Sequence, residues 1–253
     1  MKNRIKGFKK AASILALAFA AVAGTTAGIE WNGYQLFDRE SGDNLLCRAD
    51  PSCRQLTKGE IAVARSVFGD SIDYNSVKLF NRRYMLVAGK DHNISPNGNI
   101  YLSKDSTWSQ DYSGDPYWES VLIHELTHVW QVQNGRDVRQ EAFREFFKSN
   151  FNYSAVYDFD IKSDREFLRH NLEQQAAMVE RYYELRHDFR IKTRDLDLTR
   201  PAKLGTNLYR DVKTRCEEMG LYEAKIGQAI PLPPESACSA YRPKEAKKPA
   251  PSS

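Results

Sequence analysis

The sequence lacks an apolar run long enough to cross a membrane. A helix needs about 20 apolar residues to span the hydrocarbon core, and the Ala-rich apolar segment 11–23 is shorter than this. The cations that precede this segment are Lys2, Arg4, Lys6, Lys9 and Lys10. This order of cations, apolar segment and small residues is typical of a secretory signal peptide. We therefore expect a signal peptide at residues 1–27, no permanent membrane anchor, and export to the bacterial periplasm or beyond.

The chain also has little excess charge of either sign. Its formal net charge is +4, and the five cations of the expected signal peptide leave −1 when they are removed. A protein that binds nucleic acid through its phosphates needs a basic surface. The composition therefore argues against a nucleic-acid partner.

Cysteines are few, and no two of the four have the C-x-x-C spacing of a zinc-binding pair. Four cysteines in an exported chain indicate two disulfides, for which three pairings are possible. The shortest loops join Cys47 to Cys53 and Cys216 to Cys238, and we favour this pairing.

Short strands and longer helices are expected in turn along the chain. Thr57-Lys58-Gly59-Glu60 fits a capping box, which predicts a helix through Val67. Apolar and β-branched segments predict strands at 76–80, 84–88 and 99–103. Asp115-Pro116 predicts a helix start, and this helix should run to about Asn134. Further helices are expected at 138–147, from 164 onward and within 207–219, with one apolar row at Leu168, Leu172, Ala176, Val179 and Tyr183.

These elements predict an α+β fold that is mostly helical, with a small β-sheet packed on the helix that follows Asp115. We expect a disulfide-bearing N-terminal segment at 28–55 and one main domain at 56–230. The tail at 231–253 is rich in Pro, Lys and Ala, and we expect it to be partly disordered.

The chemistry of the chain is concentrated in the segment HELTH, residues 124–128. Two histidines four residues apart lie on one face of a helix and can bind one metal ion, which predicts Zn²⁺ at His124 and His128. Glu125 beside them is the expected general base, which takes a proton from the water that attacks a peptide carbonyl.

The same five letters can also occur by chance on a surface helix. Two apolar rows argue against this, because they cover most of the circumference and predict a buried helix. The rows are Trp118, Leu122, Val129 and Val132, and Ile123, Leu126 and Trp130. Buried imidazoles and a buried carboxylate need partners, and a metal ion supplies them.

The third ligand is open from the residues alone. We favour Glu173, because Ala176 and Ala177 one turn later allow its helix a close approach. His170 could be the ligand instead, or a neighbour that orients Glu173. Glu166, Glu173, Glu180 and Glu184 share one stripe of the expected helix, so a solvated charged face is the alternative interpretation.

Two further features bear on catalysis. Residues 99–103 could form an edge strand that pairs with an extended substrate, or an ordinary strand of the sheet. The hydroxyls of Tyr153, Tyr157, Tyr182 and Tyr183 are candidate donors to an oxyanion, although each could equally be a packing residue.

Four segments together resemble the small zincin-like HExxH metallopeptidase domain of Vgr-related proteins, which are associated with bacterial secretion and contractile injection systems. The segments are LTKGEIAVARSVFGDSIDYNSVKLF, ISPNGNIYL, LIHELTHVWQVQNG and FLRHNLEQQAAMVERYY, within 56–183. The resemblance implies a zincin fold with His124, Glu125 and His128 at the active site, and it favours Glu173 as a ligand. The signal peptide and the cysteine-bearing tail depart from the usual pattern, which favours ordinary export over delivery by a contractile machine.

The sequence thus predicts an exported zinc metallopeptidase that hydrolyses peptide bonds in a protein or peptide substrate. The alternative is a non-catalytic zinc-binding adaptor or scaffold for a partner in a secretion system or the envelope. An intact Glu125 favours the enzyme, because a scaffold has no need of a base beside the metal.

Overall fold

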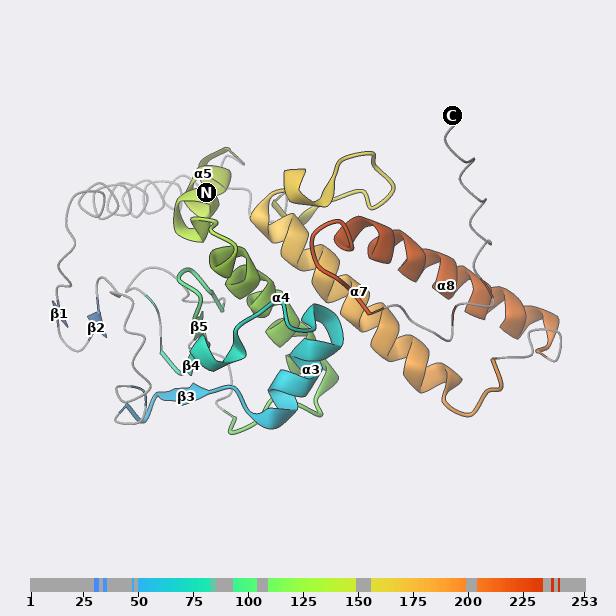
Figure 1. The fold of residues 1–253 in the computed structure, drawn as a ribbon, viewed down its shortest axis with the longest axis horizontal. Helices are drawn as coiled ribbons and strands as arrows, with labels where there is room; N and C mark the ends of the chain where they lie inside the picture. Colours follow the sequence, from blue (N-terminus) through green and yellow to red (C-terminus); the bar gives the residue numbers. More distant parts are fainter. Residues whose placement is uncertain are drawn as a thin grey trace, which may run out of the picture.

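The computed structural model describes residues 30–31, 34–35, 47, 50–82, 84, 93–103, 109–148, 156–198, 204–233, 238 and 241. The expected signal peptide, most of the strand expected at 84–88 and most of the tail after 233 lie outside these residues. The described part is α+β and mostly helical, as predicted, with its strands at one end and its long helices at the other (Figure 1). Among the described helices, none is long and apolar enough to span a membrane.

A three-stranded sheet joins segments that are far apart in the sequence. Its strands are β3 (Cys53–Gln55), β4 (Lys78–Phe80) and β5 (Ile100–Tyr101), in that spatial order. β3 pairs antiparallel with β4, and β4 pairs parallel with β5. A separate short ladder joins β1 (Glu30–Trp31) to β2 (Tyr34–Gln35).

The helix α3 (Lys58–Phe68) begins at the predicted capping box. The Glu60 amide donates to the Thr57 hydroxyl, and the Glu60 carboxylate accepts from the Thr57 amide. The same carboxylate is paired with Arg54 of β3 at 2.7 Å, so the start of the helix is fixed to the sheet. A 3-10 turn, η1 (Tyr74–Ser76), then leads into β4.

The helix α4 (Pro116–Gln133) lies at the centre of the fold. Asp115 caps it by accepting from the amides of Tyr117 and Trp118, and Pro116 occupies its first turn, as predicted. The chain leaves the helix through Gly135, whose φ of +82° is easily adopted only by a residue without a side chain. Residues on most of its circumference are buried, because α3, β5, α5 (Val138–Lys148) and α7 (Leu172–Thr193) all pack against it.

The start predicted for the next long helix was wrong. Instead of a continuous helix from residue 164, the chain forms the 3-10 turn η2 (Phe167–Arg169), and α7 begins only at Leu172. The physical reason is a second capping box: the Asn171 side chain accepts from the Gln174 amide, and the Gln174 side chain accepts from the Asn171 amide. Leu168, expected in the apolar row, is accordingly 55% exposed.

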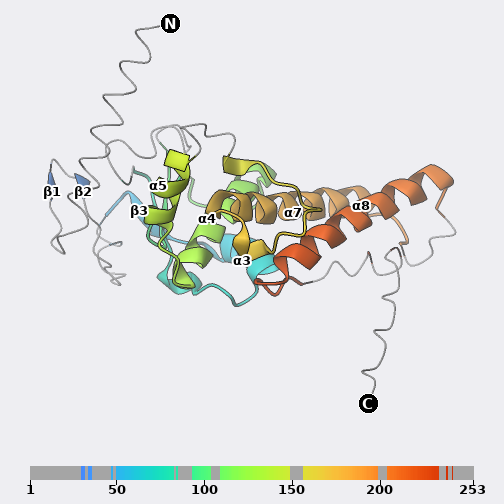
Figure 2. The ribbon, with the colours of Figure 1, turned by 90° about the horizontal axis from the view of Figure 1, so that it is seen from above.

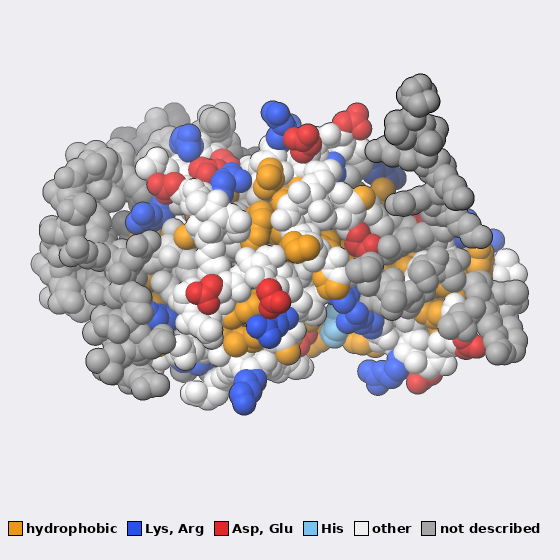
Figure 3. Space-filling view, viewed as in Figure 1, with side chains coloured by type: hydrophobic (Ala, Val, Ile, Leu, Met, Phe, Trp, Pro, Cys, Tyr) orange, Lys and Arg blue, Asp and Glu red, His pale blue; other side chains and the backbone are white. Residues whose placement is uncertain are grey.

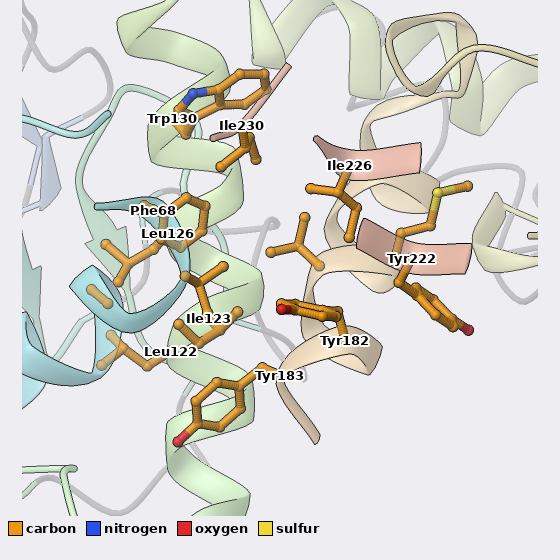
Figure 4. Close-up of a cluster of buried hydrophobic side chains, with 14 of the residues drawn as sticks. Phe68, Leu122, Ile123, Leu126, Trp130, Tyr182, Tyr183, Tyr222, Ile226 and Ile230 are labelled. Carbon is orange, nitrogen blue, oxygen red and sulfur yellow. The ribbon is translucent and has the colours of Figure 1, made fainter. Parts of the chain in front are cut away.

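The long helices α7 and α8 (Thr206–Ile226) lie side by side in both ribbon views (Figures 1 and 2). Their contact surface and that of α4 form one large apolar core, and Figure 4 shows Tyr182 and Ile226 pointing into it. Both predicted disulfides are present: Cys216–Cys238 lies in this core, and Cys47–Cys53 lies in a smaller cluster beside Phe80 and Tyr101. On the face shown in Figure 3, cationic and anionic side chains are interspersed over the described surface.

Candidate metal centre

The two histidines of α4 and a glutamate of α7 converge on one point. The rings of His124 and His128 lie 5.1 Å apart, one helical turn from each other. Glu173 stands in the first turn of α7, and its Oε2 lies 3.2 Å from His124 Nε2 and 3.4 Å from His128 Nε2. One potential metal-binding atom from each of these three side chains lies within 4.8 Å of the other two. The structure therefore brings together the three residues that the sequence suggested as a ligand set.

The two distances from Glu173 Oε2 to the imidazole nitrogens suit a small tetrahedral cation. Zn²⁺ binds imidazole nitrogen and carboxylate oxygen at about 2.0–2.2 Å. Two ligands at that distance in a tetrahedron are about 3.3–3.5 Å apart, close to the observed 3.2 and 3.4 Å. Two nitrogens and one oxygen are also a donor set that catalytic zinc sites use, with a fourth position left open. The residues present therefore fit zinc.

The opposite nitrogen of each ring is held by a separate partner. His124 Nδ1 lies 2.8 Å from Glu180 Oε2, and a carboxylate can only accept, so this nitrogen carries the proton. His128 Nδ1 lies 2.9 Å from the Gln131 Oε1 atom. The Gln131 amide nitrogen in turn donates to the Leu172 carbonyl and to Gln175 Oε1. Both rings are thereby oriented with Nε2 toward Glu173, which is how neighbouring groups prepare histidines for a metal.

Sequence reasoning missed both of these orienting residues. Glu180 was grouped with Glu166 and Glu184 in a charged stripe, and those two are indeed well exposed at 69% and 43%. Glu180 is only 29% exposed and faces His124. The available signal was its spacing, because Glu173 and Glu180 are two helical turns apart and share one face of α7. No comparable signal marked Gln131.

The electrostatics of the centre favour a bound cation. Burial lowers the pKa of His124, but hydrogen bonds to Glu173 and Glu180 outweigh it and raise the pKa to about 10. The pKa of His128 is also raised, since Glu173 offsets the effect of its burial. Burial opposes ionisation of Glu173, yet His128 and His124 hold its pKa well below its usual value. The carboxylates thus attract positive charge, which either protons on the imidazoles or a metal ion can supply.

Glu125 lies on the neighbouring face of α4 and is 5% exposed. Burial raises the pKa of its carboxyl group, while His128 and His124 act in the opposite direction. Its Oε2 accepts a hydrogen bond of 2.7 Å from the Ser95 hydroxyl. The expected general base is therefore buried beside the histidine pair and has one fixed oxygen.

His170 stands apart from the convergent group. Its Nδ1 lies 3.2 Å from Gln174 Oε1, and its ring contributes no atom to the cluster formed by His124, His128 and Glu173. Only its backbone approaches the centre indirectly, because the His170 carbonyl accepts from Gln175 Nε2.

The candidate oxyanion donors separate in the structure. The ring of Tyr157 lies 6.1 Å from that of His124. The hydroxyls of Tyr182 and Tyr183 are instead engaged by Glu223 and Glu119, respectively, so these two pack within the fold. Tyr153 lies outside the described residues.

The suggested substrate-binding edge is occupied within the chain itself. The predicted strand 99–103 is reduced to β5, and Ile94 pairs with Tyr101 on the side away from β4. This bridge takes up both the amide and the carbonyl of Tyr101. Direct strand addition at Tyr101 is therefore blocked in this conformation.

Comparison with known proteins gives a consistent relationship. No protein-family model matches the chain. The chain is 34% identical over 141 residues, 54% of its length, to the type VI secretion system spike protein VgrG2b of Pseudomonas aeruginosa, and the match spans 13% of that protein. Among solved structures it is similar to the effector domain of Pseudomonas aeruginosa VgrG2b, with a TM-score of 0.52 and 28% identity, over 72% of this chain and 96% of that domain. This homology to the effector domain of VgrG2b supports a relationship to the Vgr-related proteins.

Proposed function

We propose that this protein is an exported zinc-dependent peptidase with a zincin-like fold. The observation that carries the proposal is the convergence of His124 Nε2, His128 Nε2 and Glu173 Oε2, with both Nδ1 atoms held from behind. A structural ion pair would need only one such contact, whereas a metal site needs several donors directed at one point. Similarity to the effector domain of a secretion-system spike protein adds support, because an effector acts on a target.

Each residue has a distinct role in this proposal. His124, His128 and Glu173 hold the ion, while Glu180 and Gln131 fix the two imidazole rings. Zinc bound by these residues would supply a Lewis acid that makes water easier to deprotonate and polarises the peptide carbonyl. Glu125 accepts a proton from the attacking water and delivers it to the departing amine. Burial raises the pKa of the Glu125 carboxyl group, which makes it a better acceptor for this proton.

Export is part of the proposal. Two disulfides form and persist outside the reducing cytosol. The similar protein VgrG2b is named as a spike protein of a type VI secretion system. Similarity to a protein of a secretion apparatus is compatible with an extracytoplasmic site of action for this chain.

The decisive experiment compares wild-type protein with Glu125→Gln. Both are purified with disulfides intact, assayed for zinc by mass spectrometry, and incubated with a broad peptide library. We expect about one zinc per chain in both proteins, strong cleavage by the wild type and only residual cleavage by Glu125→Gln. Glu184→Gln is the matched control, because it removes an exposed acid from α7 and should cleave as the wild type does.

Two outcomes would overturn the peptidase. One is wild-type protein without stoichiometric zinc, and the other is equal cleavage by wild type and Glu125→Gln. Zinc binding without cleavage of any peptide would favour the adaptor or scaffold instead.

A further inference from the structure

The segment ISPNGNIY, residues 94–101, forms a turn that is anchored at both ends. The Ile94 amide donates to the Tyr101 carbonyl at 3.0 Å, and the Tyr101 amide donates to the Ile94 carbonyl at 2.9 Å. Outside this bridge, the Ser103 amide donates to Asn93 Oδ1 at 2.8 Å. Inside it, Gly98 has a φ of +84°, which allows the chain to reverse. The two ends of the turn are thereby held together, and β5 forms the second of them.

This anchoring places one hydroxyl against the expected general base. Ser95 immediately follows Ile94, is 3% exposed, and donates to Glu125 Oε2 at 2.7 Å. The two residues are 30 positions apart, so their contact depends on the turn and not on local sequence. This hydrogen bond engages Oε2 and leaves the Glu125 Oε1 atom outside it.

The surroundings of Glu125 make this hydrogen bond important. The carboxylate borders a small cavity between α4 and the sheet, whose lining is mostly apolar and also includes Asn93 and Tyr112. In such a mostly apolar setting, hydrogen bonds are electrostatically stronger than in water. Without this hydrogen bond, the Glu125 carboxylate could rotate toward the cavity, and its Oε1 atom would lose its alignment.

We propose that Ser95 is a positioning residue for Glu125: its hydroxyl fixes Oε2 so that Oε1 is presented to the attacking water. The inference rests on the proposed peptidase function and assigns a catalytic purpose to the ISPNGNIY turn. The hydroxyl does not touch the substrate and transfers no proton. It acts only through the orientation of Glu125.

The kinetic test compares Ser95→Ala, Ser95→Thr and the control Ser76→Ala, which removes an exposed hydroxyl elsewhere. Ser95→Ala should lower kcat about 10- to 100-fold, because the Glu125 carboxylate loses the hydrogen bond that orients it. KM and zinc content should stay within about twofold of the wild type, because neither the substrate nor the ligands are touched. Ser95→Thr, which keeps a hydroxyl, should recover most of the lost kcat.

A double variant separates positioning from general structural support. In the Glu125→Gln background, Ser95→Ala should cause no further loss of residual activity, because the group through which it acts is already changed. An undiminished kcat in Ser95→Ala, or a loss that is equally large in both backgrounds, would refute the positioning role.

A crystallographic readout does not depend on activity. In zinc-loaded Ser95→Ala, we expect the Glu125 carboxylate to leave its wild-type position or to occupy several. A single unchanged position overturns the inference whether or not the protein cleaves peptides. Absence of cleavage by zinc-loaded wild type, with a displaced Glu125 in the variant, would refute the peptidase and leave the Ser95 contact standing.

Discussion

The two sides of α4 achieve burial by different means. Toward α3, Leu126 points to the side of Phe68, and this surface is apolar and buried (Figure 4). Toward the first two turns of α7, the same helix buries His128 and Gln131, each of which has a named hydrogen-bond partner. The apolar side needs only complementary volume, whereas the polar side needs a donor for each acceptor. We therefore expect the apolar side of α4 to set stability and the polar side to serve the proposed metal centre.

The largest expected effect on stability comes from the apolar side of α4. Leu126→Ala removes a fully buried side chain and should lower the free energy of unfolding by about 2–5 kcal/mol, through lost burial and the cavity left behind. The folded fraction should still bind one zinc per chain. Chemical denaturation together with metal analysis measures both quantities. If folded Leu126→Ala failed to bind zinc, the two sides would not be separable.

On the polar side, the stability of chelator-treated protein should depend on pH through His124. The folded pKa of His124, about 10, lies above its ordinary value of 6.5. The stability from its ion pairs is therefore fully present below pH 6.5 and is lost as pH rises through 10. If folded His124 keeps a proton that the unfolded chain releases, the free energy of unfolding falls by at most about 2.7 kcal/mol between pH 7 and pH 9.

The measurement is the difference in unfolding free energy between wild type and His124→Gln over that range. We expect the wild type to lose stability with rising pH more steeply than the variant. Parallel curves would show that Glu173 and Glu180 do not hold a proton on His124.

A smaller effect is expected from an orienting residue. Glu180→Ala frees His124 Nδ1 and should weaken zinc affinity about 10- to 100-fold. Competition with a zinc-binding dye gives the affinity. Glu184→Ala, one turn further along α7, serves as the control and should bind zinc as tightly as the wild type. Equal zinc affinities of the wild type, Glu180→Ala and Glu184→Ala would show that Glu180 does not support the proposed metal centre.

The same contrast explains what could be predicted from the sequence. Features set by local chain geometry were predicted correctly, including the caps of α3 and α4, the shared face of His124 and His128, and the two short-loop disulfides. The start of α7 was misplaced because an apolar row was extended through Asn171, although the Asn171–Gln174 capping box was present in the sequence.

The partners of the polar side could not be predicted in this way. Ser95 reaches Glu125 across 30 residues, and Glu180 reaches His124 across 56. Such contacts are set by how the turn and α7 pack on α4, and neither periodicity nor spacing encodes that packing. Hydrogen bonds between distant elements therefore require the folded structure.

Anomalous diffraction at the zinc edge, from crystals of the purified protein, tests the central claim most directly. The proposal predicts one strong peak per chain, bound by His124 Nε2, His128 Nε2 and a Glu173 carboxylate oxygen. Imidazole rings turned away from each other, with no peak between them and Glu173, would contradict it.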